Sequence, residues 1–320
     1  MACLMAWLRL KLYSLIQSII NKLYRYPRAE WKKIKKLGGY FSYREMQRNK
    51  STMERASLNL PPVKSYPDGL LIYFLTGEKF LYQTLFCIAS LSKVSAEKFR
   101  FILVDDGNFT DELIARIERQ LPGAEIITKA IIDQNLEEKL PETNYPVLRK
   151  KRREYPHIKK LIDIHTLSVP GWKLVLDSDM LFFDEPLDMI NWLKAPVNPL
   201  HMVDCENSYG YSFSLMEKLS GHKITEKANV GAIGMNSTLI NWPELESWVK
   251  QMEELEGRSY YLEQALSVML VAGKDCVILN KDQYIVNPDG KTIINGTGVL
   301  HHYVDLSKKG YYNTAWRKVV

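Results

Sequence analysis

Hydrophobic positions along the chain follow two periods, and each period predicts a different element. Short apolar runs closed by Gly, Pro or Asp are typical of buried strands, and longer stretches with helical spacing are typical of helices. In chain order, we predict strands over 70–75, 99–104, 125–127 and 173–176, and helices over 80–91, 110–120 and 155–167. This alternation predicts an α/β fold, in which helices flank both faces of a mixed, mainly parallel sheet.

The N-terminal segment has a pattern of its own. Its apolar residues predict one amphipathic helix, because they recur at helical spacing: Leu4, Leu8, Leu12, Leu15, Ile16, Ile19, Ile20 and Leu23. Arg9 and Lys11 interrupt the apolar run, which argues against a transmembrane helix and a secretory signal. Residues 37–68 contain Gly and Pro pairs, so we predict a connector there. The predicted organisation is an arm and connector over 1–68 and a folded domain over 69–320.

Charge separates this arm from the rest of the chain. The formal net charge is +6, but residues 1–50 hold 12 Lys or Arg against 2 Asp or Glu, and the remainder holds 31 basic and 35 acidic residues. An acidic body argues against nucleic acid as its ligand. The basic arm favours docking on an anionic membrane surface; packing on its own domain or on a second subunit is the alternative. Four scattered cysteines predict neither disulfides nor a zinc site and favour the cytoplasm.

Candidate chemistry lies where the predicted strands end. The polar residues at these ends are Thr76 and Gly77, Asp105 and Asp106, and Asp177 and Asp179. Ligands of parallel sheets bind at the carboxyl ends of the strands. Asp177 and Asp179 can face one point, because alternate side chains of an extended segment point the same way. Two such carboxylates repel each other, and Mg²⁺ or Mn²⁺, which commonly hold a substrate's phosphates, would relieve the repulsion. An ordinary acidic turn is the alternative.

With these residues in view, the chain resembles nucleotide-sugar-dependent glycosyltransferases of the GT-A fold. Residues 70–316 are similar to the glycogenin-like and lipopolysaccharide-galactosyltransferase-like group known as family eight. The segment 176–181 resembles its Asp-x-Asp element, and Lys308 follows His302 by six residues, as in the group's C-terminal motif. The resemblance implies that Asp177, Asp179 and His302 hold Mn²⁺ or Mg²⁺, and that Lys308 contacts the donor diphosphate. His301 competes for the ligand role, but its spacing to Lys308 is less apt. The Pro-Trp that ends the motif is absent here.

Two further segments resemble the same group. The run over 228–236 resembles an Asn-x-Gly strand, which implies that Asn229 and Gly231 line the sugar pocket. The alternative for the glycines is a simple strand bend. The run over 261–266 resembles an acidic-Gln element, which implies that Glu263 and Gln264 act beside the reacting sugar carbon; an exposed helical pair is the alternative. Further donor contacts are assigned to Thr76, Gly77, Asp105, Asp106, Lys160 and Ser178.

These features together predict a metal-dependent enzyme. It would move a sugar from a nucleoside diphosphate, with uridine diphosphate favoured, to a hydroxyl of a glycan or lipid-linked acceptor, in cell-surface glycan synthesis. The predicted location is the cytoplasm, peripheral on the inner face of the membrane. Retention of configuration is favoured, although the segment 105–107 also resembles inverting, family-two-like enzymes.

Three other functions share some of these features. A haloacid-dehalogenase-type phosphatase also places Asp-x-Asp after a strand, but its downstream Gly-Asp pair is missing. A membrane-docked protein with a decayed sugar-nucleotide pocket and a nucleotidyltransferase are the others. The basic run over 149–153 is either a solvated loop or part of a donor-binding surface.

Overall fold

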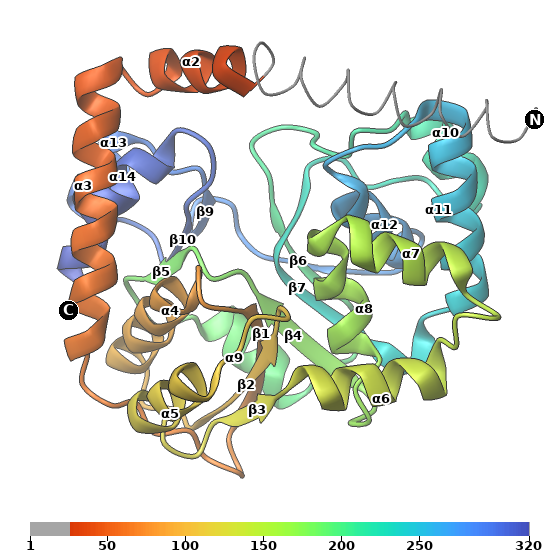
Figure 1. The fold of residues 1–320 in the computed structure, drawn as a ribbon, viewed down its shortest axis with the longest axis horizontal. Helices are drawn as coiled ribbons and strands as arrows, with labels where there is room; N and C mark the ends of the chain where they lie inside the picture. Colours follow the sequence, from red (N-terminus) through yellow and green to blue (C-terminus); the bar gives the residue numbers. More distant parts are fainter. Residues whose placement is uncertain (1–25, 320) are drawn as a thin grey trace, which may run out of the picture.

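The computed structural model describes residues 26–319, and a seven-stranded sheet forms their centre (Figure 1). Its strand order is β3-β2-β1-β4-β7-β6-β8. Neighbouring strands are parallel except that β7 runs antiparallel to both β4 and β6. The bounds are β1 Leu70–Thr76, β2 Phe99–Asp105, β3 Glu125–Ile127, β4 Trp172–Leu176, β6 Leu200–Val203, β7 Ala228–Asn236 and β8 Val277–Ile278. The predicted mixed, mainly parallel α/β sheet is therefore confirmed.

A second sheet of three short strands, in the order β5-β10-β9, lies beside the first. It consists of β5 Met180–Phe182, β9 Tyr284–Val286 and β10 Leu300–His302. The central strand β10 runs antiparallel to β5 and parallel to β9. This small sheet therefore joins the segment after β4 to the C-terminal part of the chain.

Helices cover both faces of the large sheet because its strands are apolar on both sides. Alternate residues of β1 separate the two cores: Ile72 and Phe74 join one, and Tyr73 joins the other. Helices on the first side are α3 Tyr40–Ala56, α4 Leu81–Val94, α5 Asp111–Gln120, α9 Leu187–Lys194, α13 Gly290–Asn295 and α14 Ser307–Asn313. Those on the second are α6 Lys129–Lys139, α7 Pro146–Glu154, α8 Lys159–His165, α10 Phe213–Ser220, α11 Trp242–Glu256 and α12 Leu262–Val271. Short 3₁₀ turns cover Ser57–Asn59, Pro156–Ile158, Ser237–Leu239 and Ala315–Lys318.

The structure corrects the prediction for residues 37–68. Much of the expected connector is the helix α3, which buries Met46 and Met53 at a spacing of two helical turns. Its side chains also reach the C-terminal region, because Asn49 Nδ2 donates to Asn313 Oδ1 at 3.1 Å. The two glycines before α3 made this segment resemble a connector in the sequence. With φ of 93° and 92°, they end α2 (Tyr26–Lys36) and let α3 begin directly after them.

The basic run over 149–153 is helical and not a loop. It belongs to α7, and its side chains pair with carboxylates of neighbouring elements. Arg152 Nε lies 2.6 Å from Asp163 Oδ1, and Lys151 Nζ lies 2.5 Å from Glu253 Oε1. These pairs hold α7 on the domain, so this run is a structural part of the helical layer.

The predicted amphipathic helix over residues 4–23 lies outside the described residues. Within residues 26–319, no helix combines the length and the hydrophobicity needed to cross a membrane.

Candidate metal and donor site

The acidic pair lies between the two sheets, where β4 of the large sheet ends and β5 of the small one begins. The N–H of Asp177 donates to the carbonyl of Gly231 on β7 at 2.7 Å, and the N–H of Tyr303 donates to the carbonyl of Asp179 at 2.9 Å. The backbone on either side of the turn is therefore fixed. Both carboxylates are partly exposed, with 34% of the Asp177 and 18% of the Asp179 side chain accessible.

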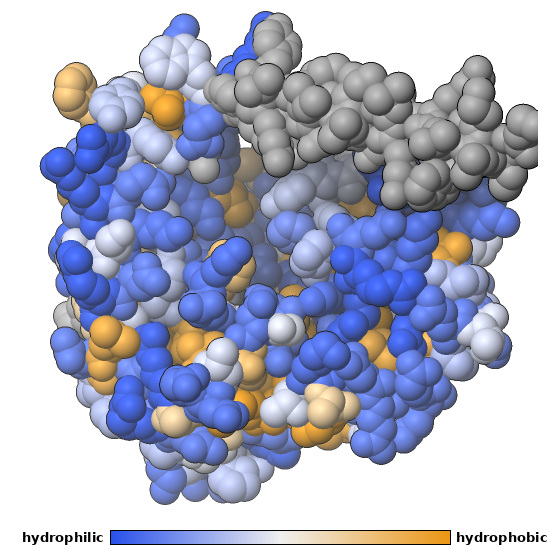
Figure 2. All heavy atoms as spheres, viewed as in Figure 1, coloured by the Kyte–Doolittle hydropathy of each residue, from blue (hydrophilic) through white to orange (hydrophobic). Residues whose placement is uncertain are grey.

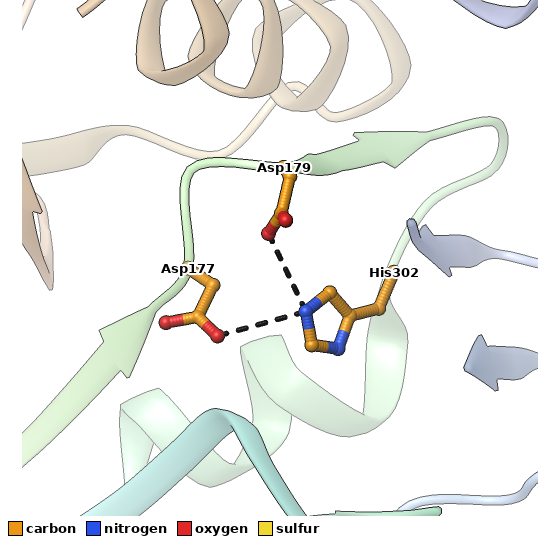
Figure 3. A group of neighbouring side chains, drawn as sticks. All are labelled: Asp177, Asp179 and His302. Atoms are coloured by element: carbon orange, nitrogen blue, oxygen red, sulfur yellow. Dashed lines mark ion pairs between the residues drawn. The ribbon is translucent and has the colours of Figure 1, made fainter. Parts of the chain in front are cut away.

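His302 reaches this pair through strand pairing. Because β10 is antiparallel to β5, His302 lies opposite Met180, one residue beyond Asp179. Its Nε2 is 3.6 Å from Asp177 Oδ2 and 3.4 Å from Asp179 Oδ1, and Figure 3 shows both carboxylates facing this nitrogen. One ligand atom from each of the three residues lies within 4.8 Å of the others.

This donor set fits a divalent cation. Two carboxylates supply hard oxygen ligands and an imidazole supplies a nitrogen, a combination that suits Mn²⁺ and Mg²⁺. His302 is 4% exposed, so it offers its nitrogen from the protein side, while the carboxylates leave the opposite side open to solvent or substrate. The three predicted ligands thus form a group able to hold a metal.

Two lysines balance the negative charge of the pair. Lys308, on α14, forms an ion pair with Asp179, and Lys160, on α8, lies 2.8 Å from Asp177 Oδ1 and donates to the carbonyl of Val230 at 2.5 Å. Burial raises the pKa of Asp179, but Lys308 and His302 outweigh it and hold that pKa below its ordinary value. Burial lowers the pKa of Lys160, but Asp177 and other acids outweigh it, so the pKa is raised and the lysine stays charged.

Gly231 makes room for the imidazole. A Cβ at this position would lie 2.3 Å from His302 Cε1 and 2.5 Å from Nδ1, closer than any side chain tolerates. Asn229, two residues earlier on β7, places its Oδ1, which can only accept, 3.1 Å from His302 Nδ1. In the described structure, both residues of the Asn-x-Gly element therefore contact the predicted metal ligand.

His301 points elsewhere. It is fully buried, and its nitrogens lie 3.0 Å from Tyr303 Oη and 2.7 Å from the carbonyl of Thr297. Its ring packs against Phe183 with the centroids 4.4 Å apart. The choice of His302 over His301 as the member of the acidic cluster is supported by this geometry.

Glu263 and Gln264 begin α12, next to the cluster. Glu263 is buried and accepts from Ser267 at 3.3 Å, and its pKa is raised to about 7 by burial, which Lys160 opposes and Asp177 reinforces. It is therefore not an exposed helical residue. Gln264 Nε2 donates to the carbonyl of Ala228 at 3.2 Å. Its Oε1 has no hydrogen-bond partner within residues 26–319.

Thr76 and Ser178 are joined by hydroxyl contacts. Thr84 Oγ1 lies 2.8 Å from Thr76 Oγ1 and 2.8 Å from Ser178 Oγ. Thr76 is buried at the end of β1 and connects to the acidic turn through this row. It therefore positions Ser178, the residue between the two aspartates.

Asp105 and Asp106 have different surroundings. Asp105 Oδ1 accepts the N–H groups of Gly107, Asn108 and Phe109, and Oδ2 accepts that of Lys129, so its carboxylate holds the turn after β2. Asp106 faces Gly77, where a Cβ would lie 2.1 Å from its Oδ1, and burial raises its pKa. Of the two, Asp106 is the better placed to contact a ligand.

Asp204 was not predicted as a site residue. It follows β6 and is 9% exposed, and its Oδ2 accepts from Asn229 Nδ2 at 2.9 Å and from Gln264 Nε2 at 3.3 Å. The sequence feature that could have indicated Asp204 is its position directly after a strand, and strand β6 was itself not predicted.

The face of the molecule drawn in Figure 2 is hollowed near its centre. Two other hollows, of about 250 and 560 Å³, lie beside Trp172 and Leu270 and beside Pro61 and Phe99, and neither is lined by a residue of the acidic cluster. The chemistry-bearing residues are thus separate from both.

The structure resembles glycosyltransferases of known structure. Mouse xyloside xylosyltransferase 1 matches with 11% identity and a TM-score of 0.48, covering 75% of this chain and 98% of that one. The galactosyltransferase LgtC, solved with donor and acceptor sugar analogues, matches with 13% identity and a TM-score of 0.42, covering 76% and 83%. Core-mannan synthase A from Aspergillus fumigatus, in an Mn/GDP form, matches with 11% identity and a TM-score of 0.40, covering 67% and 74%. No protein-family model and no curated protein matches the sequence. These likenesses are distant, so the function rests on the residues of the site.

Proposed function

We propose that this protein is a metal-dependent glycosyltransferase. It transfers a sugar from a nucleoside diphosphate, with uridine diphosphate as the favoured carrier, to a hydroxyl of a glycan or lipid-linked acceptor, with retention of configuration. The observation that carries the proposal is the cluster of Asp177, Asp179 and His302 with Lys308 on Asp179. A cluster of two acids, one imidazole and one lysine at strand ends suits a diphosphate held through a cation.

Each charged residue of the site would have a distinct role. Asp177, Asp179 and His302 hold the cation, which supplies positive charge against the diphosphate when bound. Lys308 already lies against Asp179, and a diphosphate bound there would bring its negative charge within reach of the same ammonium group. Lys160 holds the Asp177 carboxylate in place through their ion pair.

On the sugar side, α12 supplies two candidate groups. The Oε1 of Gln264, without a hydrogen-bond partner among the described residues, can face the sugar carbon as that carbon gains positive charge. Glu263, with a pKa of about 7, can hold or release a proton near neutral pH. The exposed rings of Tyr260 and Tyr261, 5.4 Å apart just before α12, offer flat apolar faces to a saccharide.

The surface where α2 meets α3 supports membrane docking. Trp31 is 56% and Phe41 87% exposed, and the exposed Lys32 and Lys35 lie on α2 beside them. Aromatic rings with lysines suit an anionic lipid surface. Lys36 Nζ lies 2.5 Å from Asp305 Oδ2, three residues before Lys308, so this surface adjoins the proposed donor site. It favours a lipid-linked acceptor for cell-surface glycan and a peripheral location on the cytoplasmic face.

Calorimetric titration with uridine diphosphate, with and without Mn²⁺, tests the proposal. We expect binding that requires Mn²⁺ and that Asp179→Asn abolishes, followed by slow hydrolysis of a matching uridine diphosphate sugar. Proton NMR of the released or transferred sugar then reads its anomeric configuration. Hydrolysis of a simple phosphate ester in place of a sugar nucleotide would instead favour a phosphatase. Binding without turnover would favour a protein that only binds sugar nucleotides, and release of diphosphate from a nucleoside triphosphate would favour a nucleotidyltransferase.

A further inference from the structure

A buried row of polar side chains lies behind the metal cluster and ends at Asp204. His302 Nδ1 lies 3.1 Å from Asn229 Oδ1, and Asn229 Nδ2 donates to Asp204 Oδ2 at 2.9 Å. Asn229 is 5% and Asp204 9% exposed. The row therefore connects the metal ligand to a largely buried carboxylate.

The Asn229 amide has one favoured orientation in this row. Asn229 Oδ1 also accepts the N–H of Gly231 at 3.0 Å, and its Nδ2 faces a carboxylate that accepts hydrogen bonds. Turning the amide over would set Nδ2 against the N–H of Gly231 and Oδ1 against Asp204, so two contacts would become repulsive. The amide oxygen consequently faces His302.

This direction decides which nitrogen of His302 carries the proton. A carbonyl oxygen only accepts, so Nδ1 must be the N–H that donates to Asn229. Nε2 then has a free lone pair, and it is Nε2 that faces Asp177 and Asp179. Metal-binding histidines are commonly fixed in this way by a partner on the other ring nitrogen.

Asp204 also holds the second half of the site. The same Oδ2 accepts from Gln264 Nε2 at 3.3 Å, so the nitrogen of that amide is held by the protein and its Oε1 is left without a partner among the described residues. We propose that Asp204 is a positioning residue that sets the tautomer of His302 through Asn229 and aims the carbonyl of Gln264 at the sugar carbon. The role of Gln264 rests on the proposed glycosyltransferase function; the role toward His302 requires only the cation site.

The test compares Asp204→Asn with two other variants of the full chain. Asp204→Asn lets the Asn229 amide turn over, and we expect about 10- to 100-fold weaker Mn²⁺ binding, measured by the electron paramagnetic resonance of free Mn²⁺. The double variant Asp204→Asn/Asn229→Asp exchanges donor and acceptor along the row, so Mn²⁺ affinity should recover. The matched control is Asp163→Asn, because Asp163 is a buried acid that pairs with Arg152 away from the cluster. It should lower stability and leave Mn²⁺ affinity unchanged.

A second measurement does not need the metal. Nitrogen-15 NMR of the ring should show Nδ1 of His302 protonated in the natural protein and a mixture of tautomers in Asp204→Asn. Natural protein with the Nε2 tautomer would overturn the proposal, as would a folded Asp204→Asn variant with unchanged tautomer and Mn²⁺ affinity. A protein with the Nδ1 tautomer but no Mn²⁺ binding would instead refute the metal-dependent function and leave the row intact.

Discussion

Replacing Gly231 with alanine adds a single methyl group directly behind His302. That carbon would lie 2.3 Å from Cε1 of the imidazole, 2.5 Å from Nδ1 and 2.8 Å from Cε of Met180. Carbon atoms in contact prefer separations of roughly 3.5–4.0 Å, so the ring must move by more than about 1 Å. Metal–ligand distances tolerate only about 0.2 Å, and such a shift removes Nε2 from a shared cation.

The effects of this change on stability and on binding should differ. Overpacking of a buried site costs about 1–3 kcal/mol of unfolding free energy, which a folded domain of this size can absorb. Mn²⁺ affinity should fall at least about 10-fold, because the ligand itself is displaced. The assays are urea unfolding followed by circular dichroism and Mn²⁺ titration of the folded variant.

Gly290→Ala is the matched control. A Cβ there meets nothing within 4 Å, so both stability and Mn²⁺ affinity should stay close to those of the natural protein. A folded Gly231→Ala variant that binds Mn²⁺ as tightly as the natural protein would refute the assignment of His302 as a ligand.

Three further predictions follow from other parts of the structure. His302→Ala should weaken Mn²⁺ binding at least about 10-fold, whereas His301→Ala should lower the unfolding free energy by on the order of 2 kcal/mol and spare Mn²⁺ affinity; the reverse order would contradict the site. Because burial raises the pKa of Glu263 to about 7, its contribution to stability is full below pH 4.5 and is lost as pH rises through 7. Between pH 4.5 and 7, the free energy of unfolding of Glu263→Gln should therefore rise relative to that of the natural protein. Urea unfolding measures both values, and a difference between them that stays constant across this pH range would contradict the prediction. Replacing Trp31 and Phe41 with alanine should reduce sedimentation with anionic vesicles at low salt, and equal sedimentation would count against docking there.

Much of the sheet could be predicted because its strands are continuous apolar runs ended by polar residues. The strands β1 to β4 lie within a residue of their predicted bounds, as buried parallel strands allow. The helices α6 and α7 were missed because their apolar faces are narrow and their many charged residues look like loop sequence. α7 buries only Leu148 and Lys151 over nine residues. Its stability comes from tertiary ion pairs that periodicity does not reveal.

The candidate site was predicted only in part, for a related reason. Asp177 and Asp179 are separated by one residue, and both follow the end of a predicted strand. His302 and Lys308 were found through their resemblance to a known motif, because the pairing of β5 with β10 is invisible in the sequence. Asp204 and the contact between Gly231 and His302 depend on packing across three strands, so neither residue type nor spacing points to them.

The pairing of β10 between β5 and β9 also has a consequence for synthesis on the ribosome. A nascent chain that has emerged as far as β5 already carries both aspartates. It gains the imidazole that joins them only when β10, which ends at His302, has been synthesised and has paired with β5 and β9. Trp316, which follows β10 in the sequence, packs against Phe86 on α4 with the ring centroids 5.3 Å apart. A chain interrupted before this strand would therefore leave a fragment that has the acidic turn but lacks the imidazole of the proposed metal site.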